Sequence, residues 1–125
     1  MIQTLLSVAL GGAIGASARF LTNVAALRLI GAGFPWATLA VNVAGSFLMG
    51  LLVICFAERG LTRLAPFAMT GVLGGFTTFS AFSLDTISLW QRGDALAATT
   101  YVAGSVVLSL AALLAGMAAA RGILA

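Results

Sequence analysis

Four long apolar stretches, separated by short polar turns, dominate this sequence. They span about residues 4–30, 36–57, 64–89 and 95–120, and the second contains no charged residue. A helix needs roughly 20 apolar residues to cross about 30 Å of hydrocarbon, and each stretch is long enough. The pattern predicts an all-α membrane protein with four transmembrane helices, forming a single domain over residues 1–125. We expect a multi-pass protein located in the cell membrane, either an inner membrane or a plasma membrane.

Composition argues against a soluble protein and against most catalytic chemistry. Charged residues make up only 7% of the chain, against roughly 25% in ordinary globular proteins, so a soluble monomer would expose large apolar patches. The chain has no His, one Cys (Cys55) and three carboxylates (Glu58, Asp85 and Asp94). A His-based catalytic triad and a soft transition-metal site are therefore excluded. The few scattered arginines do not form a nucleic-acid-binding face. We expect neither an enzyme nor a nucleic-acid partner.

The charges of the loops do not fix an orientation in the membrane. Lys and Arg normally remain on the cytoplasmic side. One side would receive Arg59, Arg63 and Arg121, and the other Arg28 and Arg92, with Arg19 if its side chain snorkels that way. Two interpretations stay open. Either a partner or one strong helix sets the orientation, or the chain inserts both ways and forms an antiparallel homodimer, as inverted-repeat transporters do within one chain.

Small and polar residues recur every four positions on three of the expected helices, so each set shares one helix face. These sets are Gly11 and Gly15; Thr38, Asn42, Ser46 and Gly50; and Tyr101, Ser105 and Ser109. In lipid, such residues commonly serve close helix packing and interhelical hydrogen bonds. An Asn and a Tyr are harder to explain by packing alone, because polar groups within a span normally face a protein interior or a water-filled path.

The third apolar stretch contains a segment that forms a poor helix. Gly74 and Gly75 each cost about 1 kcal/mol in helix propensity, and the β-branched Thr77 and Thr78 follow. Unwound backbone at this depth is tolerated only inside protein or beside a cavity, where freed carbonyls could coordinate a cation. Composition leaves two possibilities open: a broken third helix, or a kinked and otherwise ordinary helix whose glycines admit a neighbour.

Three segments resemble motifs of the Fluc fluoride-channel family, also called CrcB. Residues 74–83 (GGFTTFSAFS) resemble the family's central signature, residues 11–20 (GGAIGASARF) its first-helix motif, and residues 38–47 (TLAVNVAGSF) its second-helix motif. The resemblance extends over all four helices. It implies an antiparallel dual-topology homodimer with two fluoride pathways and a structural sodium ion between the subunits. It also implies a fluoride-selective channel that exports fluoride passively and lowers cytoplasmic fluoride.

The resemblance also implies roles for individual residues. Fluoride has a large hydration cost, so its path must replace water with hydrogen-bond donors. The expected donors are Thr38, Asn42, Ser80, Tyr101, Ser105 and Ser109. The positive ring edges of Phe79 and Phe82 would line the path, although spacing alone favours packing for this pair. Arg19 is expected near one pathway mouth, where it would attract anions. The backbone carbonyls of Gly74 and Thr77 would bind the sodium ion.

The sequence departs from the family pattern at three positions, and two other functions remain to be weighed. Phe76, Ala81 and Asp85 stand where Leu, Thr and Glu are expected, which leaves one pathway hydroxyl and the partner of the acid open.

A small four-helix multidrug and proton antiporter would need a carboxylate in its first helix, where this chain has Arg19 and no acid. A non-transporting membrane assembly subunit would use the polar stripes for packing only.

Overall fold

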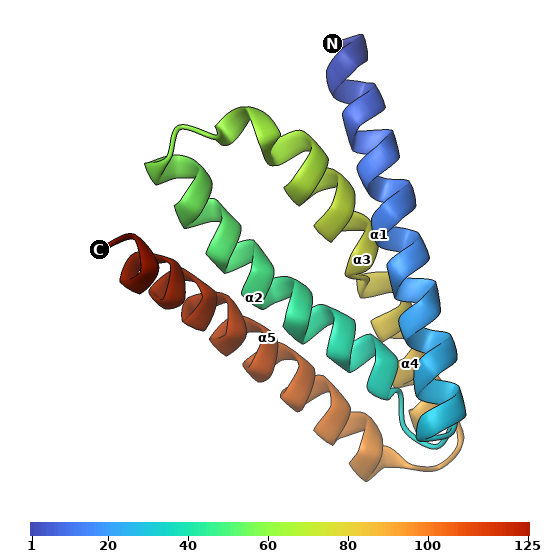
Figure 1. Ribbon diagram of the computed structural model, residues 1–125. Coiled ribbons are helices and arrows are strands. Elements are labelled where there is room, and N and C mark those ends of the chain that lie inside the picture. The colour runs from blue at the N-terminus through green and yellow to red at the C-terminus, as the bar shows by residue number, and fades with distance from the viewer.

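The computed structural model describes residues 1–125, and its regular structure is entirely helical. The elements are α1 (Ile2–Leu29), α2 (Trp36–Glu58), η1 (Thr62–Leu64), η2 (Pro66–Leu73), α3 (Gly74–Phe76), α4 (Phe79–Gln91) and α5 (Ala95–Leu124) (Figure 1). The short elements from η1 to α4 form one span, Thr62–Gln91, and α1, α2 and α5 form the other three. All four are long and apolar enough to cross a membrane, which confirms the predicted all-α membrane class.

Local sequence explains where several helices begin and end. Gly60 has a φ of +64°, a left-handed conformation that glycine adopts without strain, and it follows the end of α2 at Glu58. Asp94 begins α5, because its carboxylate accepts a hydrogen bond from the Ala97 N–H at 3.1 Å. The last helix continues to Leu124, beyond the expected end near residue 120, since no Gly-Pro or polar turn interrupts it.

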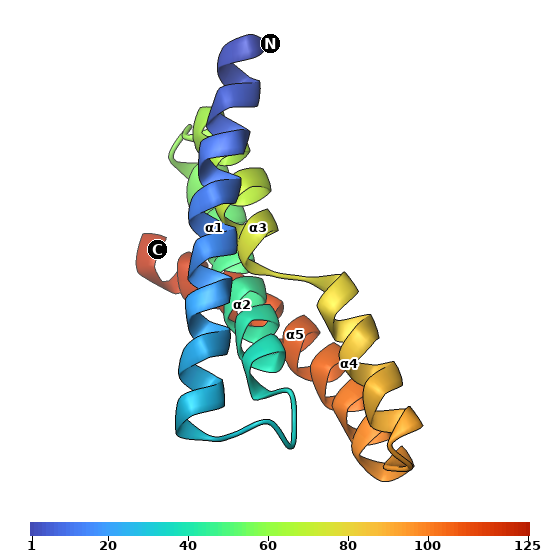
Figure 2. The same ribbon diagram turned by 90° about the vertical axis from the view of Figure 1, so that its right-hand side faces the viewer.

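The third span changes neighbours halfway along its length. Its first half, η2 and α3, packs along α1, whereas α4 packs against α5, and α2 packs along α5. Figure 2 shows the cause, because an extended link follows α3 and α4 then diverges from α1. The link consists of Thr77 (φ −85°, ψ 159°) and Thr78 (φ −156°, ψ 122°), both extended. The span therefore has its non-helical backbone at two threonines.

The two glycines before this link remain helical. Gly74 has φ −62° and ψ −37°, and Gly75 lies within α3. Low glycine propensity therefore does not mark the position of the extended residues. The threonines satisfy the adjoining helix ends instead: the Thr77 hydroxyl donates to the Leu73 carbonyl at 2.8 Å, and the Thr78 hydroxyl accepts from the Ala81 N–H at 3.1 Å. Gly75 serves packing, because an added Cβ would lie 2.6 Å from the Gly12 carbonyl oxygen.

Glycines also let α1 approach the third span closely. A Cβ added at Gly11 would overlap the Phe67 carbonyl oxygen, and one added at Gly15 would overlap that of Val72. The expectation that this pair serves close helix packing is confirmed. Such contacts matter because only 15 of the 125 residues are buried. A single chain therefore has a thin core, and lipid or another chain must cover most of its apolar side chains.

We expect Gly15→Ala to lower the free energy of unfolding by about 1–3 kcal/mol, the usual cost of overpacking. Gly12→Ala is the matched control, because its Cβ would meet no atom within 4 Å. The control should change stability by about 1 kcal/mol at most, toward greater stability, because Ala has the higher helix propensity. Thermal unfolding of both variants in detergent measures the difference. Equal stability of the two would contradict the close packing of α1 on the third span.

Candidate functional site

Asn42 of α2 holds the extended link of the third span through both of its amide atoms. Its Nδ2 donates to the Thr78 carbonyl at 3.0 Å, and its Oδ1 accepts from the Thr78 N–H at 2.8 Å. The side chain thus replaces the helical partners that this backbone has lost, which matters because unpaired backbone groups in a membrane cost several kcal/mol. Only one Asn42 N–H remains for any ligand.

Arg19 of α1 satisfies a second backbone group at the same place. Its Nε donates to the Gly75 carbonyl at 3.0 Å. In a continuous helix that carbonyl would accept from the Phe79 N–H, but the extended residues intervene. A positive charge is also favoured at the carboxyl end of a helical segment. Arg19 is half-buried and therefore anchors α3 while its remaining N–H groups stay free.

An open cavity of about 380 Å³ lies beside the link and is lined by residues of α2, α4 and α5. Its lining includes five of the residues expected from the sequence to form the pathway: Asn42, Phe79, Phe82, Ser105 and Ser109. No charged side chain lines it. An ion in this cavity would therefore meet hydroxyl, amide and aromatic groups, and it would meet no ion partner that could trap it.

The hydroxyls of Ser105 and Ser109 are buried and have no hydrogen-bond partner within the chain. Serines and threonines within helices commonly donate to the carbonyl four residues earlier. Five hydroxyls of this protein do so, namely those of Thr22, Thr77, Ser83, Thr86 and Thr99. The two serines of the cavity differ from them. An unpaired buried hydroxyl is costly, so these two groups, on residues that line the cavity, remain free to donate to a polar group from outside the chain.

Two aromatic rings border the same cavity. Phe79 and Phe82 have ring centroids 5.5 Å apart and planes inclined by 47°. Phe79 is 78% exposed in the single chain, so intramolecular packing does not account for its position. Both rings line the cavity, and the edges of such rings carry partial positive charge.

Three other expected pathway residues lie outside this cavity. Ser80 is exposed, with its hydroxyl 3.3 Å from that of Thr78. Tyr101 is buried, and its hydroxyl donates to the Asp85 carboxylate at 3.1 Å. Thr38 lines two neighbouring cavities instead. The pairing of Tyr101 with Asp85 was not predicted, although a lone acid within a span needs a polar partner, which is a signal for such a pair.

Two further cavities lie between the link and the loops at one end of the molecule. The first has a volume of about 280 Å³ and is lined by Arg19, Thr38, Thr78, Ala81 and Asp85 among others. It adjoins the serine-lined cavity at Thr78, which both share. Ala81 supplies only a methyl group to this wall, where the family pattern led us to expect a hydroxyl.

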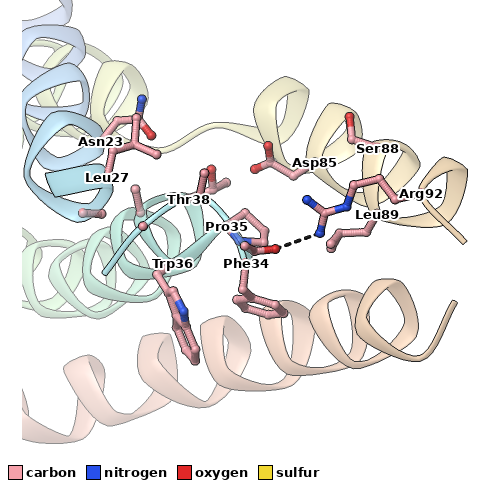
Figure 3. Close-up of a pocket in the computed structure, with 15 residues that line it drawn as sticks. Asn23, Leu27, Phe34, Pro35, Trp36, Thr38, Asp85, Ser88, Leu89 and Arg92 are labelled. Carbon is pink, nitrogen blue, oxygen red and sulfur yellow. Dashed lines mark hydrogen bonds between the residues drawn. The ribbon is translucent and has the colours of Figure 1, made fainter. Parts of the chain in front are cut away.

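The second of these cavities, of about 180 Å³, lies at the loops (Figure 3). It shares Thr38 and Asp85 with its neighbour, and Arg92 lines its outer end. Figure 3 shows the Asp85 and Arg92 side chains directed into the same space. Neighbouring cavities therefore share lining residues, Thr78 at mid-span and Thr38 and Asp85 nearer the loops.

The carbonyls of Gly74 and Thr77, expected as sodium ligands, have lost their regular helical donors. In a continuous helix they would accept from the N–H groups of Thr78 and Ala81. Those N–H groups bond Asn42 and the Thr78 hydroxyl instead. Both carbonyl oxygens are hard ligands that fit a desolvated monovalent cation. No cluster of His, Cys, Asp or Glu in the chain could hold a metal ion by its side chains.

Comparison with known proteins gives a consistent result. Residues 6–117 match the family model described as CrcB-like protein, Camphor Resistance (CrcB). A protein of Cereibacter sphaeroides named fluoride-specific ion channel FluC is 65% identical over 122 residues, which cover 98% of each chain. One of the same name from Paracoccus denitrificans is 58% identical over 125 residues and 100% of each chain. Another from Mesorhizobium japonicum is 50% identical over 120 residues, covering 95% of this chain and 97% of the relative.

We expect Asn42→Ala to destabilise the extended link, at a cost of about 1–3 kcal/mol for each backbone group left unpaired. The Thr78 amide should then exchange with deuterium about tenfold faster or more, because 1.4 kcal/mol corresponds to a factor of ten. Ser46→Ala is the matched control, since Ser46 lines the same cavity one helical turn along α2. Unchanged exchange at Thr78 in Asn42→Ala would show that Asn42 does not hold the link.

Proposed function

The chain belongs to the CrcB family, and we propose on that premise that it is a fluoride-specific ion channel. It conducts fluoride passively out of the cell and so lowers cytoplasmic fluoride. The curated relatives that carry this channel name match the chain over nearly its whole length. The protein is a channel and not an enzyme.

The observation that carries this function is the uncharged cavity with two unpaired serine hydroxyls. Ser105 and Ser109 lie one helical turn apart on α5 and line the same space as Phe79 and Phe82. A small anion with a high hydration cost needs donors in place of water, and ring edges add weak positive charge. Because no arginine lines this cavity, fluoride is bound weakly at several points, as conduction requires.

The adjoining cavities continue this pathway. Thr38 is a further donor toward the loops, and Arg19 raises the local anion concentration there. The Tyr101 hydroxyl donates a hydrogen bond to Asp85 and orients its carboxylate. Tyr101 thus affects the pathway through Asp85, which lines the two cavities nearer the loops. Ser80 lies on the exposed face of α4, where a second subunit would bring it to the path.

The two alternatives have less support. A multidrug and proton antiporter would need an acid in its first helix, and α1 contains none. A non-transporting assembly subunit would use the hydroxyls of Ser105 and Ser109 for packing against a partner, but the relatives are named as ion channels.

The working unit that we propose is an antiparallel, dual-topology homodimer in the inner or plasma membrane. Its support is the near-equal count of arginines at the two membrane sides and the small buried core of one chain. The exposed ring of Phe79 and the adjoining link lie on a face that a second chain would cover. Such a dimer would carry two pathways of opposite direction.

We further propose a structural sodium ion between the two subunits. The carbonyls of Gly74 and Thr77 from each chain would hold it, four oxygens in all. Support comes from the donors these carbonyls have lost to Asn42 and to the Thr78 hydroxyl. The ion neutralises carbonyl dipoles that would otherwise be unpaired in the membrane, and it links the two chains.

We expect purified protein in liposomes to release fluoride faster than protein-free liposomes, measured with a fluoride-selective electrode. Phe79→Ile and Phe82→Ile should each reduce this flux by about tenfold, because Ile keeps apolar bulk and loses the polarised ring edge. Ser105→Ala and Ser109→Ala should reduce it by about two- to tenfold, the range of a single net hydrogen bond.

Two variants serve as matched controls for this flux experiment. Phe47→Ile changes an exposed ring of α2, and Thr99→Ala removes a hydroxyl of α5 that already bonds its own helix. Neither residue lines the cavity, and both variants should conduct as the wild type does. Wild-type liposomes without fluoride release would contradict the function, whereas full flux in all four pathway variants would contradict only the assigned path.

We expect the dimer to unfold at a lower temperature when sodium is replaced by a large organic cation. The difference would be about 2.7 kcal/mol where sodium stands at one hundred times its dissociation constant. Thr77→Val is the control: it removes the hydroxyl and keeps the carbonyl, so it should retain the sodium dependence. Equal stability and equal flux in the two cations would remove the ion from the proposal.

A further inference from the structure

Arg92 connects two loops at the outer end of the cavity series. Its Nη2 donates to the Gly33 carbonyl at 2.8 Å, so the loop after α4 is tied to the loop between α1 and α2 (Figure 3). The bond uses one N–H of a guanidinium that has five. The other donors of this exposed side chain remain available at the cavity of about 180 Å³ that Arg92 lines.

The position of this cavity relates Arg92 to the proposed fluoride route. The cavity shares Asn23, Thr38 and Asp85 with the Arg19 cavity, which in turn shares Thr78 with the serine-lined cavity. An anion route from Arg92 to the link would run past these shared residues. Arg92 therefore lies at the outer end of the series and Arg19 near its middle.

The charges along the series favour an anion. Arg19, Asp85 and Arg92 are the three charged residues that line these cavities, which gives a formal charge of +1. Without Arg92 the formal charge would be zero, and the outer cavity would contain only the acid. Arg28 lies on the same side of the molecule and is exposed, but it lines none of the three cavities.

We propose that the cavity between these two loops is the mouth of the fluoride route, and that Arg92 attracts fluoride to it. The inference rests on the proposed channel function and deepens it by assigning a residue to anion recruitment. One positive charge raises the concentration of a monovalent anion in water about fivefold at 4 Å and less further away. The loop tie to Gly33 keeps this charge at the opening.

The test compares fluoride efflux from liposomes for Arg92→Gln, Arg92→Lys and Arg28→Gln at subsaturating fluoride. Gln removes the charge while keeping an amide donor for the loop, Lys keeps the charge, and Arg28→Gln removes an equal charge outside the cavities. Each variant is measured at about 10 mM and about 1 M of an impermeant salt, where the Debye lengths are about 30 Å and 3 Å.

At low salt we expect Arg92→Gln to reduce flux by about two- to fivefold, and at high salt to match the wild type. Arg92→Lys and Arg28→Gln should stay within about twofold of the wild type at both. Equal flux of Arg92→Gln and wild type at low salt would overturn the inference. An equal loss in the Gln and Lys variants at both salts would also overturn it, since that pattern belongs to the loop tie alone. Absent wild-type flux would instead contradict the channel function.

Discussion

The structure depends on one constraint: backbone groups within a membrane must find hydrogen-bond partners inside the protein. Thr77 and Thr78 are extended in the middle of an apolar span, so the regular helical bonds around them are lost. Asn42 replaces two of them and Arg19 a third, while the threonine hydroxyls satisfy the ends of α3 and α4. Asn42 and Arg19, whose polar side chains are costly to place in lipid, are therefore the residues that stabilise the third span.

The same link positions the route. Because the span changes direction at Thr77 and Thr78, α3 stays with α1 and α4 moves to α5 (Figure 2). The divergence leaves space that side chains of α2, α4 and α5 line, and Phe79 and Phe82 face it at the start of α4. Thr78 then belongs to two adjoining cavities. One backbone feature thus borders both the mid-span cavity and the neighbouring cavity nearer the loops.

Sequence reasoning succeeded where a residue type has one physical use in lipid. The length and apolarity of four segments required helices, and Gly11 and Gly15 indicated a close approach that the structure contains. Sequence alone says less where a side chain has several uses. Asn42, expected as a pathway donor, lines the cavity and also holds Thr78 through both amide atoms, and Tyr101 bonds Asp85 outside the serine-lined cavity. Periodicity placed these residues on a face but did not identify their partners.

The sequence by itself determined the membrane class, the number of spans, the absence of enzyme chemistry and, through three motifs, the resemblance to a channel family. The membrane class and the spans follow from the free energy of transferring apolar side chains into lipid, which adds up over residues that are close in the chain. The motifs are local patterns of the same kind. Only the tertiary structure decided that Gly74 and Gly75 stay helical while the threonines do not. It also decided that Arg19 bonds Gly75, 56 residues away, and that Arg92 bonds Gly33, 59 residues away. Such pairings depend on how helices pack in space, because each polar group takes the partner that packing brings within reach.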